Sequence, residues 1–85
     1  MKLYGKLVKN TKIIREIFVE NNDDSVSFAD KLEGCLLGLC KELDISAPLW
    51  LKKNTKELGA FRKTSFTQEH FVEKIRFDSF EIRLA

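Results

Sequence analysis

Few residues of this chain have side chains that could perform chemistry, and the most conspicuous are two cysteines in the stretch EGCLLGLC at residues 33–40. This stretch is typical of the middle of a helix, where Cys35 and Cys40 would lie about 140° apart, with Cα atoms about 8 Å apart. A disulfide requires Cα atoms closer than about 7 Å, and a zinc site requires more ligands than two thiols. We therefore predict that Cys35 is a core residue and that Cys40 lies at the edge of the core.

The single histidine, His70, has no nearby cysteine or histidine with which to bind a metal. It could act as a general base only beside a carboxylate that orients it, which leaves catalysis as a remote alternative. The pair Asp23-Asp24 lacks the spaced ligands and terminal glutamate of a calcium loop. No glycine-rich phosphate loop or nucleophile motif is present. We expect no catalytic, metal-binding or cofactor-binding residue, and a protein that is not an enzyme.

The composition is that of an ordinary globular protein, with 85 residues, 44% of them hydrophobic and 33% charged. This length suits one domain, residues 1–85. The net charge of +2 is too small to indicate a polyanionic partner by itself. No apolar run approaches the roughly 18 residues of a membrane span, and the N-terminus lacks an apolar export signal. We expect a cytoplasmic location, reduced thiols and no membrane partner.

The first twenty residues predict a β-hairpin, because they are rich in β-branched and aromatic side chains. Asn10-Thr11 is the expected two-residue turn. The resulting register places four apolar residues on the face expected to meet the core: Leu3, Leu7, Ile14 and Phe18. The opposite face, with Tyr4 among basic residues, is expected to be partly exposed.

The next segment predicts the main helix, over residues 28–43. Ser27 followed by Asp30 resembles a capping box, and Pro48 requires the helix to end before it. The helical period gathers the apolar side chains into one core stripe: Phe28, Leu32, Cys35, Leu36, Leu39 and Leu43.

Beyond Pro48 the pattern is weaker. Residues 49–51 form a short apolar segment expected to cover the core, and residues 54–57 could form one helical turn ended by Gly59. Ser65 or Thr67 could begin a short helix through Ile75. Alternation of Phe80, Ile82 and Leu84 predicts a C-terminal strand. The fold class is therefore α+β: an N-terminal β-hairpin, one main helix on a small, mostly antiparallel sheet, a loop-rich connection with one or two short helices, and a C-terminal strand.

Two surfaces are candidates for function. Gly34 and Gly38 lie one turn apart on the main helix, away from the core stripe and beside Leu37, and glycine within a helix costs about 1 kcal/mol relative to alanine. Another backbone in close contact would explain them, either residues 48–63 of the same chain or a second copy or partner protein. We therefore predict a protein interface at Gly34, Leu37 and Gly38, or at the Tyr4 face, and a homodimer as one outcome.

The second surface is basic and aromatic. Residues 52–63 hold five basic side chains against one carboxylate, that of Glu57. Cations beside aromatic rings are typical of single-stranded nucleic acid grooves, so weak nucleic-acid binding is the alternative function. Its predicted residues are Lys52, Lys53, Phe61, Arg62, Lys63 and Phe66. The competing interpretation is that both phenylalanines anchor the core and that the cations are solvated.

Three stretches carry a resemblance to a known group of proteins: KLYGKLVK at residues 2–9 with Ile13-Ile14, CKELDISAPLWL at residues 40–51, and FTQEHF with FDSFEI at residues 66–71 and 77–82. In these the chain resembles a family of short, uncharacterised bacterial cytoplasmic proteins. The shared motifs are structural: a hairpin, a helix exit and a terminal strand. The resemblance implies a bacterial cytoplasmic domain and no particular activity.

Overall fold

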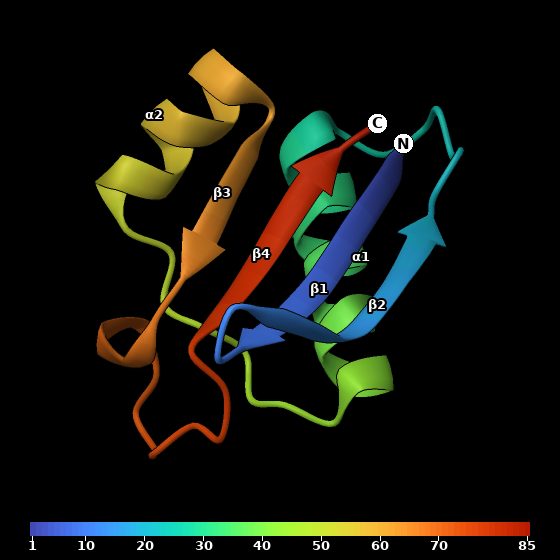
Figure 1. Cartoon of the computed structure of the whole chain (residues 1–85). Coiled ribbons are helices and arrows are strands. Elements are labelled where there is room, and N and C mark those ends of the chain that lie inside the picture. Colours follow the sequence, from blue (N-terminus) through green and yellow to red (C-terminus); the bar gives the residue numbers. More distant parts are fainter.

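The computed structural model describes all 85 residues and shows an α+β fold with four strands and two helices (Figure 1). In chain order the elements are β1 (Lys2–Lys9), β2 (Lys12–Glu20), α1 (Phe28–Leu43), α2 (Lys52–Phe61), β3 (Lys63–Phe66), a 3₁₀ turn (Gln68–His70) and β4 (Ser79–Leu84). The strands form one antiparallel sheet in the order β2-β1-β4-β3. Both helices pack on one face of this sheet, and the fold class predicted from the sequence is confirmed.

The N-terminal hairpin has the predicted turn but a different register. Asn10 and Thr11 both have positive φ angles, of 52° and 65°, as a two-residue hairpin turn of type I′ requires. A β-bulge lies between Leu7 and Val8, which pair with Arg15 and Ile13, so that Ile14 has no partner in the ladder.

Because of the bulge, two of the four residues predicted to face the core do not do so. Leu3 and Leu7 are buried, as expected, but Ile14 and Phe18 are 49% and 51% exposed. One extra residue in β2 shifts every side chain between the bulge and the strand's end to the other face. Phe18 consequently pairs with Tyr4 on the outer face of the sheet.

Helix α1 begins and ends at the predicted residues. The Ser27 hydroxyl accepts a hydrogen bond from the Asp30 N–H at 3.2 Å, and Asp44 ends the helix in the left-handed conformation, with a φ of 56°. The helix buries five side chains against β1 and β2: Cys35, Leu36, Leu39, Cys40 and Leu43. The predicted place of Phe28 in the core is wrong, because it is 60% exposed at the first position of the helix.

Gly5 allows α1 to approach β1 closely. A Cβ atom at this position would lie 3.0 Å from Leu39 Cδ1 and 3.1 Å from Phe80 Cε1, which is closer than packed carbon atoms normally approach. Leu39 and Phe80 are themselves fully buried. The missing side chain of Gly5 therefore sets the distance between the main helix and the sheet.

Helix α2 is longer than predicted, with ten residues, and includes Gly59 instead of ending there. The fully buried amide of Asn54 ties it to β3. Asn54 Nδ2 donates to Thr64 Oγ1 at 2.8 Å and to the Ser65 carbonyl at 3.2 Å, and its Oδ1 accepts from the Leu51 N–H at 2.8 Å. Strand β3, with four residues, was not predicted, because so short a segment shows no clear period.

The C-terminal strand β4 is confirmed, with Phe80 and Ile82 buried. The short helix predicted through Ile75 is reduced to the single 3₁₀ turn Gln68–His70. Because α1 packs on β1 and β2 whereas α2 packs on β3, the two helices straddle β4 (Figure 1).

The close contact at Gly5 leads to a first prediction. Gly5→Val should lower the free energy of unfolding by about 1–3 kcal/mol, because the added methyl groups overpack the core against Leu39 and Phe80. Gly34→Ala is the control: its Cβ meets no atom within 4 Å, and alanine in a helix should stabilise by about 0.5–1 kcal/mol. Urea unfolding measures both values, and an unchanged stability in Gly5→Val would contradict the close approach of α1 to β1.

Candidate functional site

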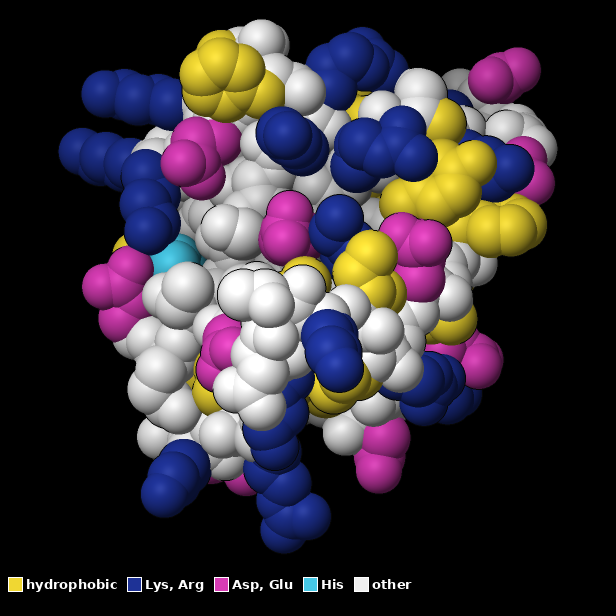
Figure 2. Space-filling view, in the orientation of Figure 1, with side chains coloured by type: hydrophobic (Ala, Val, Ile, Leu, Met, Phe, Trp, Pro, Cys, Tyr) yellow, Lys and Arg dark blue, Asp and Glu magenta, His cyan; other side chains and the backbone are white.

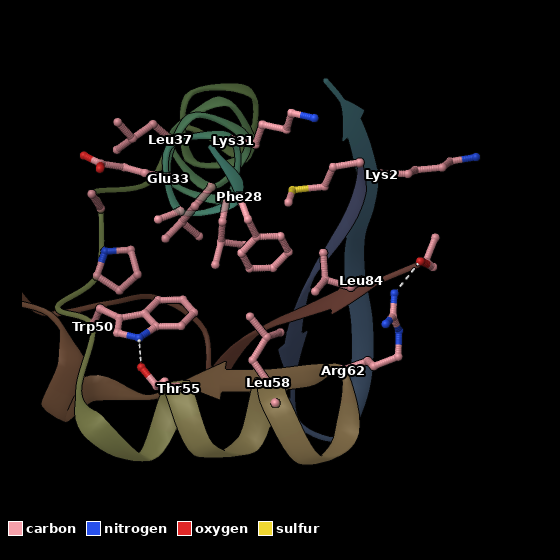
Figure 3. Close-up of a pocket in the computed structure, with 18 residues that line it drawn as sticks. Lys2, Phe28, Lys31, Glu33, Leu37, Trp50, Thr55, Leu58, Arg62 and Leu84 are labelled. Atoms are coloured by element: carbon pink, nitrogen blue, oxygen red, sulfur yellow. Dashed lines mark hydrogen bonds between the residues drawn. The ribbon is translucent and has the colours of Figure 1, made fainter. Parts of the chain in front are cut away.

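The most prominent surface feature is an apolar groove between α1 and α2, beside the end of β4. Its volume is about 1070 Å³, comparable with the upper end of the range of about 300–1,000 Å³ typical of ligand sites. Figure 3 shows Phe28 of α1 and Leu58 of α2 pointing toward each other across this space. Trp50 from the connection and Leu84 of β4 enter it from the two sides. We refer to this space as the α1/α2 groove.

The lining of the groove is mainly hydrophobic, at 11 of 18 residues. Besides the four residues just named, the hydrophobic lining consists of Met1, Ala29, Leu32, Leu36, Leu37, Ala47 and Ala85. The Trp50 indole N–H donates to Thr55 Oγ1 at 2.8 Å, and its ring lies 5.7 Å from that of the buried Phe66. The indole is therefore held in place, and the groove is preformed on this side.

Phe28 has most of its side chain exposed within this groove. A phenylalanine in this position leaves apolar area in water, and its burial against a partner would contribute about 1.5–3 kcal/mol. It is the first residue of α1, at the end of the helix that lies beside the start of β1 and the end of β4 (Figure 1).

The interface residues predicted from the sequence belong to two alternative surfaces, one on α1 and one on β1. Gly34 is exposed, and a Cβ atom added there would meet no atom within 4 Å, whereas one added at Gly38 would lie 3.7 Å from Val19 Cγ1 of β2. Leu37 lies on the groove side of the helix. Tyr4 lies on the opposite face of the sheet, 5.7 Å from the Phe18 ring and 4.4 Å from Arg83 Cζ. Of the four, only Leu37 belongs to the groove.

The residues predicted for nucleic-acid binding are also dispersed. Phe66 is fully buried in the core, so its ring is not available to a base. Lys53 on α2 forms a 3.0 Å ion pair with Glu69, which lowers the pKa of that carboxyl group. Lys63 lies on β3 opposite Arg83 of β4. The remaining members are Lys52 on α2, the exposed Phe61 at its end, and Arg62, whose Nη2 donates to the Ala85 carbonyl at 2.9 Å.

The open face of the sheet carries charges of both signs. Figure 2 shows Lys and Arg side chains interspersed with Asp and Glu over this face. On β1, Lys6 lies between Glu16 of β2 and Glu81 of β4. The face therefore offers no extended cationic track of the kind that binds a nucleic acid backbone.

The cysteines and the histidine lie inside the protein. Cys35 and Cys40 are free. Cys35 is a core residue, as predicted, and Cys40, predicted at the edge of the core, is equally buried within it. Burial raises the pKa of both thiols, that of Cys40 to about 11. His70 is fully buried, where its Nδ1 accepts a hydrogen bond from the Thr67 N–H at 3.1 Å and its Nε2 has no partner. No group of three or more potential metal-ligating side chains is present.

Sequence reasoning missed the groove because its residues are spread over four elements. The sequence predicts Phe28 as part of the core and Trp50 as part of a segment that covers the core. The available signal was the position of Phe28, which is the first residue of the helix, directly after its capping residue Ser27. Leu58 could not be placed before α2 was known.

No protein-family model, curated protein or solved structure matches the chain. The resemblance to a family of short bacterial proteins consequently stays a prediction. Neither helix has the length and apolar character needed to cross a membrane.

Burial of the thiols predicts slow alkylation. In the native protein both cysteines should react with iodoacetamide at pH 8 at least about tenfold more slowly than in urea, because the reactive thiolate is scarce and enclosed. Burial raises the pKa of the Cys40 thiol from its ordinary value of 9.0 to about 11. This raised pKa stabilises the folded state below pH 9, and the stabilisation is lost as the pH rises through 11. Mass spectrometry of labelled protein measures the rates, and rapid native labelling would contradict this placement.

His70 should be a structural residue. His70→Ala should lower the free energy of unfolding by about 2–4 kcal/mol, because it leaves a cavity and an unpaired Thr67 N–H. His70→Asn retains an acceptor for that N–H and should recover part of the loss. Equal losses in both variants, measured by urea unfolding, would show that the hydrogen bond to Nδ1 does not contribute.

Proposed function

We propose that this chain is a non-enzymatic protein-interaction module that binds apolar side chains of a partner polypeptide in the α1/α2 groove. The main support is the convergence of large apolar side chains from α1, α2, β4 and the connection at Trp50 on one open space, with Phe28 60% exposed. Binding energy in protein interfaces is concentrated in such aromatic and aliphatic pockets. Closing this groove would bury apolar area that folding alone leaves in water.

The chemistry of the lining favours binding over catalysis. Catalysis by proton transfer or nucleophilic attack requires paired polar groups within hydrogen-bond reach. The lining hydroxyl, Thr55 Oγ1, already accepts from Trp50. The lining carboxylate, Glu33, extends from α1 on the side away from Leu84 and Arg62 (Figure 3). The lining contains neither cysteine nor histidine.

Nucleic-acid binding stays the alternative function. Its best remaining residues are Lys52 at the start of α2, the exposed Phe61 at its end, and Arg62 directly after it. Phosphate contacts would be strongest at low ionic strength. The absence of any affinity for single-stranded oligonucleotides at low salt would eliminate this alternative.

The proposed function can be tested with two matched glycine variants. Gly59 lines the groove and Gly34 does not, yet a Cβ at either position meets no atom within 4 Å. Gly59→Phe should therefore fill the groove, and Gly34→Phe should add the same bulk outside it, without disturbing the core. Helical peptides displayed on phage should be enriched by the wild-type protein and by Gly34→Phe, and at least about tenfold less by Gly59→Phe.

The same selection can contradict the proposal. No enrichment on the wild-type protein, or equal enrichment on all three proteins, would show that the groove is not a peptide-binding site. Light scattering of the unliganded proteins is the accompanying control. A dimer that Gly59→Phe dissociates would instead identify a second copy of the chain as the partner in the groove.

A further inference from the structure

We infer that the polypeptide bound in the α1/α2 groove is an acidic amphipathic helix, an inference that rests on the proposed function. The groove lies between two helices and over a strand that is paired on both sides. Three features of the groove, namely the paired strand beneath it, its volume and the charges at its rim, limit the conformation, the size and the charge of the partner segment.

The conformation follows from the position of β4. Its two neighbours in the sheet are β1 and β3, and it pairs with both of them. No free strand edge therefore faces the groove, and an extended peptide could not add a strand there. A helix satisfies its own backbone hydrogen bonds, so it can present side chains to the groove without backbone partners.

The size of the groove suits a short helical segment. A cylinder about 10 Å wide that rises 1.5 Å per residue fills 1070 Å³ with roughly nine residues, or between two and three turns. Ala29, Thr55 and Gly59 on the groove walls are small, and small side chains let another backbone come close. The partner's apolar residues, at helical spacing, would then contact Phe28, Trp50 and Leu58.

The expected charge of the partner helix follows from the charged side chains at the rim of the groove. Lys31 and Arg62 line it, against the single side-chain carboxylate of Glu33. Lys2 also lines the groove, but its Nζ lies over the Phe18 ring on the opposite face of the sheet. Lys31 lies 3.9 Å from Asp24, which is fully exposed, and such a pair is weak.

Two further lysines lie along the α2 side of the groove. Lys52 and Lys56 are exposed, and each stands three residues before a lining residue, Thr55 and Gly59 respectively. Residues three apart on a helix are neighbours on its surface. The polar face of the partner helix should therefore carry glutamate and aspartate opposite these lysines.

The first test of this inference is the charge of the selected peptides. The peptides enriched by the wild-type protein should carry excess Glu and Asp beside an i, i+3, i+4, i+7 apolar stripe. The most enriched peptide and a charge-swapped form, with lysine at each acidic position, are then titrated into the protein. Trp50 is the only tryptophan in the chain and lines the groove, so its fluorescence reports occupancy directly.

The acidic peptide should bind at least about tenfold more tightly than the charge-swapped form at low salt, and the ratio should fall as salt screens the charges. Lys52→Glu with Lys56→Glu should weaken the acidic peptide by about tenfold. Lys9→Glu with Lys12→Glu makes the same change in net charge at the hairpin turn, and should have an effect of less than about twofold.

The outcomes distinguish this inference from the proposed function. Selected peptides without an excess of Glu and Asp, or equal binding of the acidic and charge-swapped peptides, would overturn the acidic character of the partner. If Gly59→Phe still abolished that binding, the groove would remain supported as the binding site. An acidic peptide that lacks helical spacing and helical circular dichroism when bound would overturn the helix. No peptide binding at all would overturn both the groove and its acidic partner.

Discussion

The two helices of this protein are anchored to different parts of the sheet, and the rest of the structure depends on this separation. Leu39 of α1 packs directly over Gly5 of β1, because no side chain there holds the helix away. At the β3 edge of the sheet, on the same face, the Asn54 amide makes three hydrogen bonds that join α2 to β3 and to its own first turn. Neither anchor can move toward the other without losing buried contacts or leaving polar groups unpaired.

The α1/α2 groove is a consequence of these anchors. Because α1 covers β1 and β2 and α2 covers β3, the end of β4 at Leu84 lies between the helices. Phe28 and Trp50 border the same gap, the first at the start of α1 and the second held by its hydrogen bond to Thr55. The groove walls are therefore regular elements with fixed positions, which lowers the ordering cost of binding a partner.

The opposite face of the sheet has a different character. Lys2 Nζ lies 4.2 Å from the centre of the Phe18 ring, and Arg83 Cζ lies 4.4 Å from that of Tyr4. The exposed rings are thus covered by cations from the same face, and cation–π contacts of this kind contribute about 0.5–1 kcal/mol at exposed sites. With its mixed charges (Figure 2), this face is typical of a solvated surface.

Local signals predicted much of the fold. The Ser27 cap and the apolar period defined α1 to the residue, Asn10-Thr11 defined the hairpin turn, and alternation defined β4. The features that were missed depend on contacts between distant residues. The bulge beside Leu7 decides which face of β2 meets the core, and no local pattern marks it.

The candidate site was harder to predict for the same reason. Strand β3 becomes a strand by pairing with β4, and the groove exists only once both helices are placed. The two glycines of α1 predict a contact surface from the sequence. In the structure a Cβ atom at Gly34 would meet no atom within 4 Å and one at Gly38 would meet only Val19, so residues 48–63 of the same chain do not cover them, and a partner at this surface stays a prediction.

The central claim is that the α1/α2 groove is open in solution, and side-chain NMR with a dissolved nitroxide tests it most directly. The ring signals of Phe28 and the methyl signals of Leu84 should be strongly attenuated by the nitroxide, because both line the groove. The signals of Leu39 and Phe80, which are fully buried beneath α1, should be preserved. Protection of Phe28 equal to that of Leu39 would show that the helices close over β4, and would contradict this account.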